Sequence, residues 1–119
     1  MDIKKLLFKT LNIKPITNLT VDNKVYYLHI PNIPKEGQYV EYEILNEYGE
    51  YYGNGREILT TYRIQVDIFS YKAGDKFFEL EKEIRKAMLS NGFIKENVFD
   101  AYEKDTKLYH KALRFNITL

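Results

Sequence analysis

The segment from Glu57 to Tyr71, EILTTYRIQVDIFSY, constrains the fold most, because its apolar and polar residues alternate over about ten positions. Alternation with a period of two is typical of a β-strand whose two faces meet different surroundings. One face would carry Ile58, Tyr62, Ile64, Val66 and Ile68, and the other Arg63, Gln65 and Asp67. We therefore expect a sheet with one face in a hydrophobic core and one polar face.

Two segments have apolar residues at helical spacing, so we expect two amphipathic helices. The first covers residues 2–11, has lysines between its leucines, and should end before Pro15. The second covers residues 75–91, with Asp75 as its capping residue and Asn91-Gly92 as a left-handed stop. Its apolar stripe consists of Phe77, Leu80, Ile84, Ala87 and Met88.

The remaining strands follow from runs of β-forming residues between turn signals. A first strand is expected over residues 24–30, and a second, over residues 38–45, should pair with a partner that begins near Arg56. The last two strands are expected over residues 94–102 and 107–118, joined by a turn at residues 103–106. The order helix, three strands, helix, two strands predicts a single α+β domain over residues 1–119, with a mostly antiparallel sheet of about five strands packed against two helices.

Residues 44–58, ILNEYGEYYGNGREI, are expected to form a hairpin loop that holds three tyrosines. Tyrosine and arginine are enriched where proteins meet, so Tyr48, Tyr51 and Tyr52 beside Arg56 indicate a docking element. The alternative is an ordinary long hairpin whose tyrosines fold back on their own sheet. The glycines of this stretch precede a strand and no helix, so we do not expect a phosphate-binding loop.

Reactive side chains are sparse and scattered. There is no cysteine, His29 and His110 are the only histidines and lie far apart in sequence, and Asp67 and Asp100 are lone carboxylates. Nucleophilic, metal-assisted or paired-carboxylate catalysis needs several such groups to converge. We therefore expect no enzyme, no cofactor and no bound metal.

The overall charge bears on the possible partners. The chain has 18 basic and 17 acidic side chains, so it lacks the strong positive field that attracts proteins to nucleic acid. A single-stranded nucleic-acid module built on the tyrosine-rich sheet remains an alternative. The N-terminal MDIKKLLFKTLNIKP does not resemble a signal peptide, and no apolar run approaches the ~18 residues of a membrane span, so we expect a soluble protein.

Three stretches carry a family resemblance: GREILTTYRIQVDIFSY, FFELEKEIRKAMLSNGF and DAYEKDTKLYHKALRFNITL. With the N-terminal helix, the proline and the strand VYYLHI, they resemble the tail completion, or tail terminator, proteins of tailed bacteriophages and prophages. Residues 31–55 have no counterpart in this resemblance. The matching positions are Tyr62, Ile64, Val66, Asp67, Ile68, Phe69, Ser70, Gly92, Phe93, Asp100, Tyr102, Glu103, Asp105, Thr106, Tyr109, His110, Lys111, Arg114 and Phe115.

The resemblance implies a structural, non-enzymatic α+β subunit of the virion, assembled in the cytoplasm of the host bacterium. Such subunits form a six-fold ring on the head-proximal end of the tail tube, end its polymerisation and offer a surface to the head connector. The implied partners are further copies of the chain, the tail tube protein and a connector or stopper protein. A related alternative is that the chain is itself a head-tail connector or stopper.

A closed ring needs two different patches on each subunit that meet head to tail. We expect the polar sheet face to supply one of them, with subunit or tube contacts made by Arg63, Gln65, Asp67, Arg114 and Asn116. The tyrosine loop would dock on the tube or the connector. Neither a membrane nor specific direct binding of nucleic acid is expected.

Overall fold

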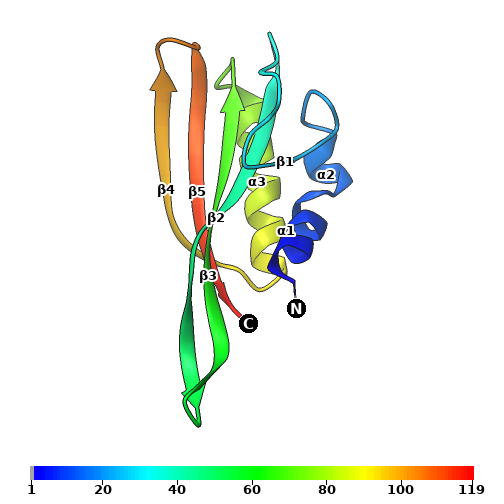
Figure 1. Cartoon of the computed structure of the whole chain (residues 1–119). Helices are drawn as coiled ribbons and strands as arrows, with labels where there is room; N and C mark the ends of the chain where they lie inside the picture. Colours follow the sequence, from blue (N-terminus) through cyan, green and yellow to red (C-terminus); the bar gives the residue numbers. More distant parts are fainter. Residues whose placement is uncertain (1) are drawn as a thin grey trace.

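A five-stranded sheet with helices packed on one side forms the fold, as seen in the computed structural model (Figure 1). The structure describes residues 2–119, without the side chains of residues 50–52, 57 and 58. The predicted α+β class is confirmed. The elements in chain order are α1 (Ile3–Leu11), α2 (Lys14–Thr17), β1 (Tyr26–Tyr27), β2 (Gln38–Gly53), β3 (Arg56–Ser70), α3 (Asp75–Ser90), β4 (Ile94–Glu103) and β5 (Leu108–Thr118).

Strand β3 lies at the centre of the sheet, whose order is β1-β2-β3-β5-β4. Only β1 runs parallel to its neighbour β2; the other pairs are antiparallel. The register places Val66 of β3 between Tyr42 of β2 and Leu113 of β5. Each row of side chains across the sheet therefore keeps to one face, as the alternation in β3 requires.

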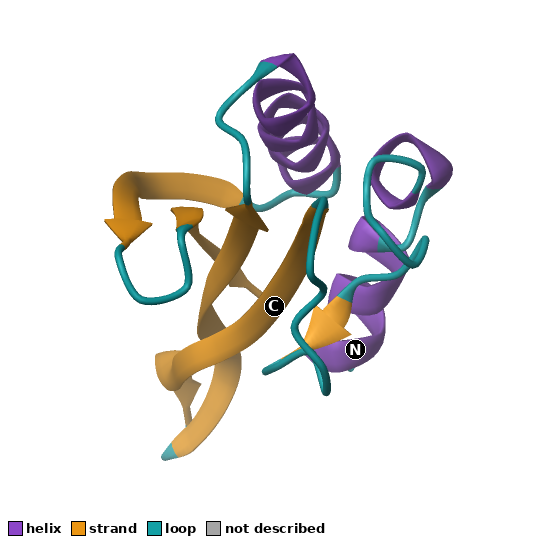
Figure 2. Ribbon diagram, turned by 90° about the horizontal axis from the view of Figure 1, so that it is seen from above, coloured by secondary structure: helices purple, strands orange, loops and turns teal. Residues whose placement is uncertain are grey.

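The main core lies between this sheet and the helices α1 and α3 (Figure 2). The strand β3 contributes Ile64, Val66 and Ile68, all fully buried, as predicted from the alternation. The helices contribute fully buried leucines and isoleucines at the expected spacing. These helical residues are Leu7 and Leu11 of α1 and Leu80 and Ile84 of α3.

The helix ends follow the local sequence. The Asp2 carboxylate accepts a hydrogen bond from the Lys4 backbone N–H at 2.9 Å and so caps α1. For α3 the predicted cap is wrong by one residue: Gly74 is the N-cap and Asp75 is the first helical residue, where its charge still favours the helix dipole. Gly92, with φ of +90°, provides the predicted left-handed stop.

Two predicted features of the N-terminal third are wrong. The chain forms a second short helix, α2, at the point where Pro15 was expected only to end the first one. Proline fits the first turn of a helix because no N–H bond is needed there. The strand predicted over residues 24–30 contains only the two residues of β1, because the chain turns away at Leu28, where φ is +69°.

The predicted tyrosine loop at residues 44–58 is also wrong, because its backbone is almost entirely strand. Strand β2 continues to Gly53 and β3 begins at Arg56, which leaves Asn54-Gly55 as a two-residue turn. Both turn residues have positive φ, +54° and +74°, as in a type I′ hairpin turn. The backbone thus follows the alternative of an ordinary long hairpin, with register shifts after Ile44 and Gly49.

The far half of this hairpin leaves the body of the protein. Strand β5 ends opposite Thr61, and the Leu119 backbone pairs with Thr60, so beyond this point residues 50–59 continue as a two-stranded ribbon. We call residues 50–59 the arm. It projects beyond the helices and gives the molecule its elongated shape of 53 × 28 × 24 Å (Figure 1).

A core truncation checks this arrangement. Phe115 of β5 is fully buried among residues of the main core, whereas Ile94 of β4 is 63% exposed. We expect Phe115→Ala to lower the free energy of unfolding by about 3–5 kcal/mol and Ile94→Ala to change it by less than about 1 kcal/mol. Urea titrations followed by circular dichroism measure both, and equal losses in the two variants would contradict the placement of the core.

Candidate contact surface on the helix-free face

We call the face of the sheet opposite α1, α2 and α3 the helix-free face. All five residues predicted to form contacts lie on it: Arg63, Gln65 and Asp67 from β3, and Arg114 and Asn116 from β5. The register sets Gln65 opposite Arg114 and Arg63 opposite Asn116. Their gathering on one face follows from the alternation, while their contact with another protein stays a prediction.

Three of these residues form a chain of hydrogen bonds that ends on a histidine. Arg114 Nε donates to Gln65 Oε1 at 2.9 Å, and Gln65 Nε2 donates to Asp67 Oδ1 at 2.8 Å. His110 Nε2 lies 2.7 Å from the same Asp67 oxygen. Because an ionised carboxylate can only accept, His110 carries its proton on Nε2 in this contact. The Arg114 guanidinium also lies over the Phe99 ring, 4.9 Å from its centroid.

The other two residues share a partner that was not predicted, Glu96. Arg63 donates to both Glu96 oxygens, at 2.9 and 3.2 Å, and Asn116 donates to one of them at 3.1 Å. The hydrogen bond from Arg63 lowers the pKa of Glu96, and the bond from Asn116 acts in the same direction. Glu96 reaches this face at a register shift in β4 between Lys95 and Val98, and the sequence contains no local signal for that shift.

The helix-free face is not polar throughout, which corrects the expected picture. Across β2, β3 and β5, the rings of Tyr39, Phe69 and His110 stack in a row with centroid separations of 4.9 and 4.3 Å. Beside the row, Ile30 and Leu108 are buried with Tyr39 in a second, smaller core. Phe69 packs against this core and stacks on the His110 ring.

Asp67 is not the lone carboxylate that the sequence predicts, because its register partner on β2 is Glu41 and both are 7% exposed. Glu41 accepts the Ile30 backbone N–H at 2.8 Å and lies 3.4 Å from His29. Among the side chains that the structure describes, no group of three or more potential ligands is arranged to hold a metal ion. The hydrogen bonds of both carboxylates go to groups of the same chain, which suits them to hold the strands in register.

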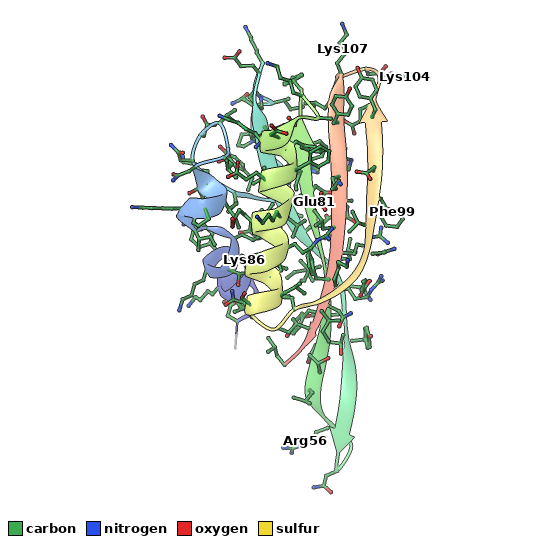
Figure 3. The ribbon with its side chains drawn as sticks, turned by 180° about the vertical axis from the view of Figure 1, so that it is seen from behind. Arg56, Glu81, Lys86, Phe99, Lys104 and Lys107 are labelled. Atoms are coloured by element: carbon green, nitrogen blue, oxygen red, sulfur yellow. The ribbon has the colours of Figure 1, made fainter. Side chains whose placement is uncertain are left out.

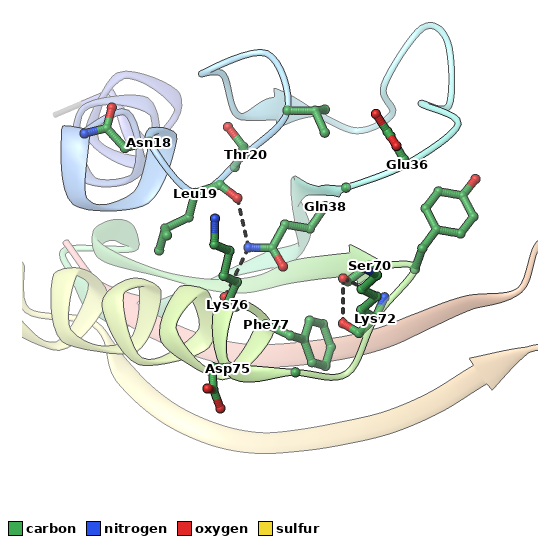
Figure 4. A pocket seen from close by; sticks show the side chains of 14 residues that line it. Asn18, Leu19, Thr20, Glu36, Gln38, Ser70, Lys72, Asp75, Lys76 and Phe77 are labelled. Carbon is green, nitrogen blue, oxygen red and sulfur yellow. Dashed lines mark hydrogen bonds between the residues drawn. The ribbon is translucent and has the colours of Figure 1, made fainter.

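A hollow lies away from this face, at the end of β2 opposite the arm (Figure 4). Its volume is 740 Å³, and it lies between the α2–β1 connection and the start of α3. Gln38 spans it, since its amide nitrogen donates to the carbonyl oxygens of Leu19 and Lys76 at 2.8 and 3.1 Å. None of the predicted site residues lines this hollow.

Three docking candidates, Tyr51, Tyr52 and Arg56, belong to the arm, and Tyr48 lies at its base. Tyr48 is 48% exposed, and Arg56 lies near the far end of the arm (Figure 3). The side chains of Tyr51 and Tyr52 are outside the described part of the structure, although their backbone belongs to β2.

Comparison with models of known protein families and with curated proteins gives no match to this chain. No helix within residues 2–119 is both long and apolar enough to cross a membrane.

The His110–Asp67 contact predicts a pH dependence of stability. The hydrogen bond that His110 donates to Asp67 raises the pKa of His110 above its ordinary value, against the opposing effect of burial. A raised pKa adds stability in full below the ordinary histidine value of about 6.5, and that part is lost as the pH rises through the folded-state pKa. We expect the free energy of unfolding, measured by urea titration, to fall as the pH rises from about 6.5 through the folded-state pKa of His110.

The matched variants for this test are His110→Gln and His29→Gln. His110→Gln should remove this part of the slope, whereas His29→Gln should keep it because His29 is 88% exposed. Equal slopes in the two variants would show that the His110–Asp67 contact contributes nothing.

Proposed function

We propose that this chain is a structural subunit of a bacteriophage or prophage tail that closes the head-proximal end of the tail tube as a ring of six copies. In this role it ends tube polymerisation and joins the tail to the head connector. The observation that carries the proposal is the resemblance of the chain to tail terminator proteins, whose matching positions run from Tyr62 to Phe115. The proposal includes no enzymatic activity.

The matching positions support the proposal because they include residues of the main core and residues of the helix-free face. Ile64, Val66 and Phe115 belong to the main core, so one part of the pattern specifies the packing of the sheet. Asp67 and Arg114 belong to the hydrogen-bonded chain of the helix-free face. A pattern that includes both a core and a polar face is expected of a subunit that must fold and then assemble.

The shape of the molecule also suits assembly. A ring of identical subunits needs two different patches on each copy. The helix-free face and the arm are different in structure and lie on different parts of the molecule (Figure 1). The ion pair of Arg63 with Glu96 is partly exposed, at 36% and 21%, so both side chains remain reachable from outside.

Binding of single-stranded nucleic acid is the second candidate, and one observation favours it. Tyr102 and Tyr109 form an exposed ring pair, 4.9 Å between centroids, at the end of the sheet near Lys104 and Lys107 (Figure 3). Aromatic rings beside cations can stack bases. Such binding would weaken steeply with salt, and an affinity that is both measurable and salt-dependent would favour this candidate over the ring.

The capping function is tested on tail tubes polymerised from the tube protein of the same phage or prophage. We expect added chain to stop elongation, so that tubes keep their length, and to appear as extra density at one end of each tube in electron micrographs. Phe115→Ala, which should lower the free energy of unfolding, is the destabilised control and should cap less well. Tubes that grow equally with and without the folded chain would refute the proposal.

A charge exchange tests whether the Arg63–Glu96 pair takes part in capping. Arg63→Glu alone leaves two carboxylates in contact, so we expect lower stability as well as loss of capping. The double variant Arg63→Glu/Glu96→Arg restores the internal pair with its charges exchanged. We expect it to unfold close to the wild-type melting temperature and still fail to cap the tube. Full capping by the double variant would show that the pair only stabilises the fold.

A further inference from the structure

The outer side of α3 has two acidic residues followed by two basic residues. The acids are Asp75 and Glu79, and the bases are Lys82 and Lys86. Their spacings of four, three and four residues place all four on one side of the helix, and all four are exposed. Within the described side chains, no ion pair involves any of them. Like charges four residues apart repel slightly, so a partner with the opposite order of charges would relieve both pairs.

Two apolar side chains lie along the same side of α3. Phe78 is 56% exposed and Leu89 is 48% exposed. A hollow of 340 Å³ extends from one to the other and is also lined by Lys82 and Lys86. The helix dipole favours acids near the start of a helix and bases near its end, but it gives no reason for large apolar side chains in solvent. An exposed apolar surface around a hollow is a feature of contact sites.

The described part of the chain leaves this side of α3 uncovered. The opposite side of the helix, with Leu80 and Ile84, packs into the main core. In Figure 2, α3 lies at the outside of the helical layer, and in Figure 3 it lies in front of the sheet. A partner for the outer side therefore has to come from another molecule.

The order of the charges fits a second copy of the same helix. When two copies of α3 pack antiparallel, the acids of each lie opposite the lysines of the other. Asp75 then lies opposite Lys86 of the second copy, and Glu79 opposite its Lys82. Each of these pairs occurs twice, whereas a parallel pair in register would set like charges together. The outer side of α3 is therefore complementary to itself.

The apolar side chains agree with the same register. It sets Phe78 of the second copy opposite residue 83, which is midway along the helix between Phe78 and Leu89. This is the level of the hollow that those two side chains border. The ring of each copy would therefore enter the hollow of the other, so charge and shape favour one arrangement.

We propose that two copies of the chain pair through the outer sides of their α3 helices, antiparallel and related by a two-fold axis. A two-fold contact uses the same patch on both copies and closes on itself. It is therefore separate from the head-to-tail contacts of the proposed ring and goes beyond them. Because the sheets lie on the far sides of the two helices, the helix-free faces point away from each other and stay accessible.

Charge reversal tests the contact in the full chain. Lys82→Glu/Lys86→Glu makes the outer side of α3 entirely acidic and replaces four attractions in the dimer with four repulsions. We expect it to raise the dissociation constant of the dimer at least about tenfold. Analytical ultracentrifugation in a concentration series measures this, and circular dichroism confirms that the variant is folded. The matched control is Lys5→Glu/Lys9→Glu on α1, which makes the same change in charge at the same spacing and should dimerise like the wild type.

Restoring the charges tests the pairing itself. Asp75→Lys/Glu79→Lys makes the outer side of α3 entirely basic and should also dimerise poorly. An equimolar mixture of the acidic and the basic variant should dimerise, and so should one chain that carries all four substitutions. The dimer should weaken as sodium chloride rises from about 0.05 to about 0.5 M, because salt screens exposed charges.

The apolar part of the contact has its own matched pair of variants. Phe78→Ser should weaken the dimer, because the hollow of the second copy is then left unfilled. Phe8→Ser on α1 should have no effect, although Phe8 is equally large and is 51% exposed. Equal dimerisation of the two variants would show that Phe78 takes no part.

Cross-linking determines the orientation, because the chain has no cysteine of its own. A mixture of Asp75→Cys and Lys86→Cys chains should form a disulfide-linked dimer on mild oxidation. Asp75→Cys alone should not, since its two cysteines would lie about 16 Å apart along the antiparallel helices. A wild-type chain that is monomeric at every concentration, or a mixture that cross-links no faster than either variant alone, would overturn the proposal.

The capping assay keeps this contact distinct from the ring. Folded Lys82→Glu/Lys86→Glu should cap tail tubes like the wild type, because the α3 contact is not part of the ring. Loss of capping in this variant would overturn the separation of the two contacts. Failure of the α3 dimer together with normal capping would refute this inference alone and leave the proposed function standing.

Discussion

The alternation of side chains along β3 is the constraint on which the rest of the structure depends. Its inward row, Ile64, Val66 and Ile68, is fully buried and packs with the apolar sides of the helices in the main core. Without this row, the helices would have no apolar surface to pack against. A shift of β3 by one residue would turn that row outward and bring Arg63 and Asp67 into the core. The cost of burying those charges without partners is large, so the register of the whole sheet is strongly determined.

The same register explains why the helix-free face is ordered. Several of its polar residues bond to a partner on the neighbouring strand, as Arg114 does with Gln65 and His110 with Asp67. A face whose groups are already paired costs less to bury in an interface, because few donors or acceptors would be left unsatisfied. It also has fixed geometry, which favours a specific partner over a general one.

Much of the fold was predictable from local pattern. The helix α3 and the central strand β3 lie within one residue of their predicted ranges, because their periodicity is long. The two C-terminal strands also lie within one residue, because Gly92 and the turn at residues 103–106 bound them. The errors occur where the signal was short or mixed. Strand β1 has only two residues, which are too few to show a periodicity. The glycines of residues 44–58 suggested a loop, whereas the Asn54-Gly55 turn alone reverses the chain.

The sequence by itself determined which residues of β3 and β5 share a face, since a strand alternates its side chains whatever surrounds it. It did not determine their partners. Glu96 contacts Arg63, which lies 33 positions earlier in the sequence, and His110 contacts Asp67, which lies 43 positions earlier. These contacts depend on strand order, on register and on the shift in β4 after Lys95, and tertiary packing selects all three. Tertiary structure also left the arm without a third strand, because β5 reaches only to the base of the arm.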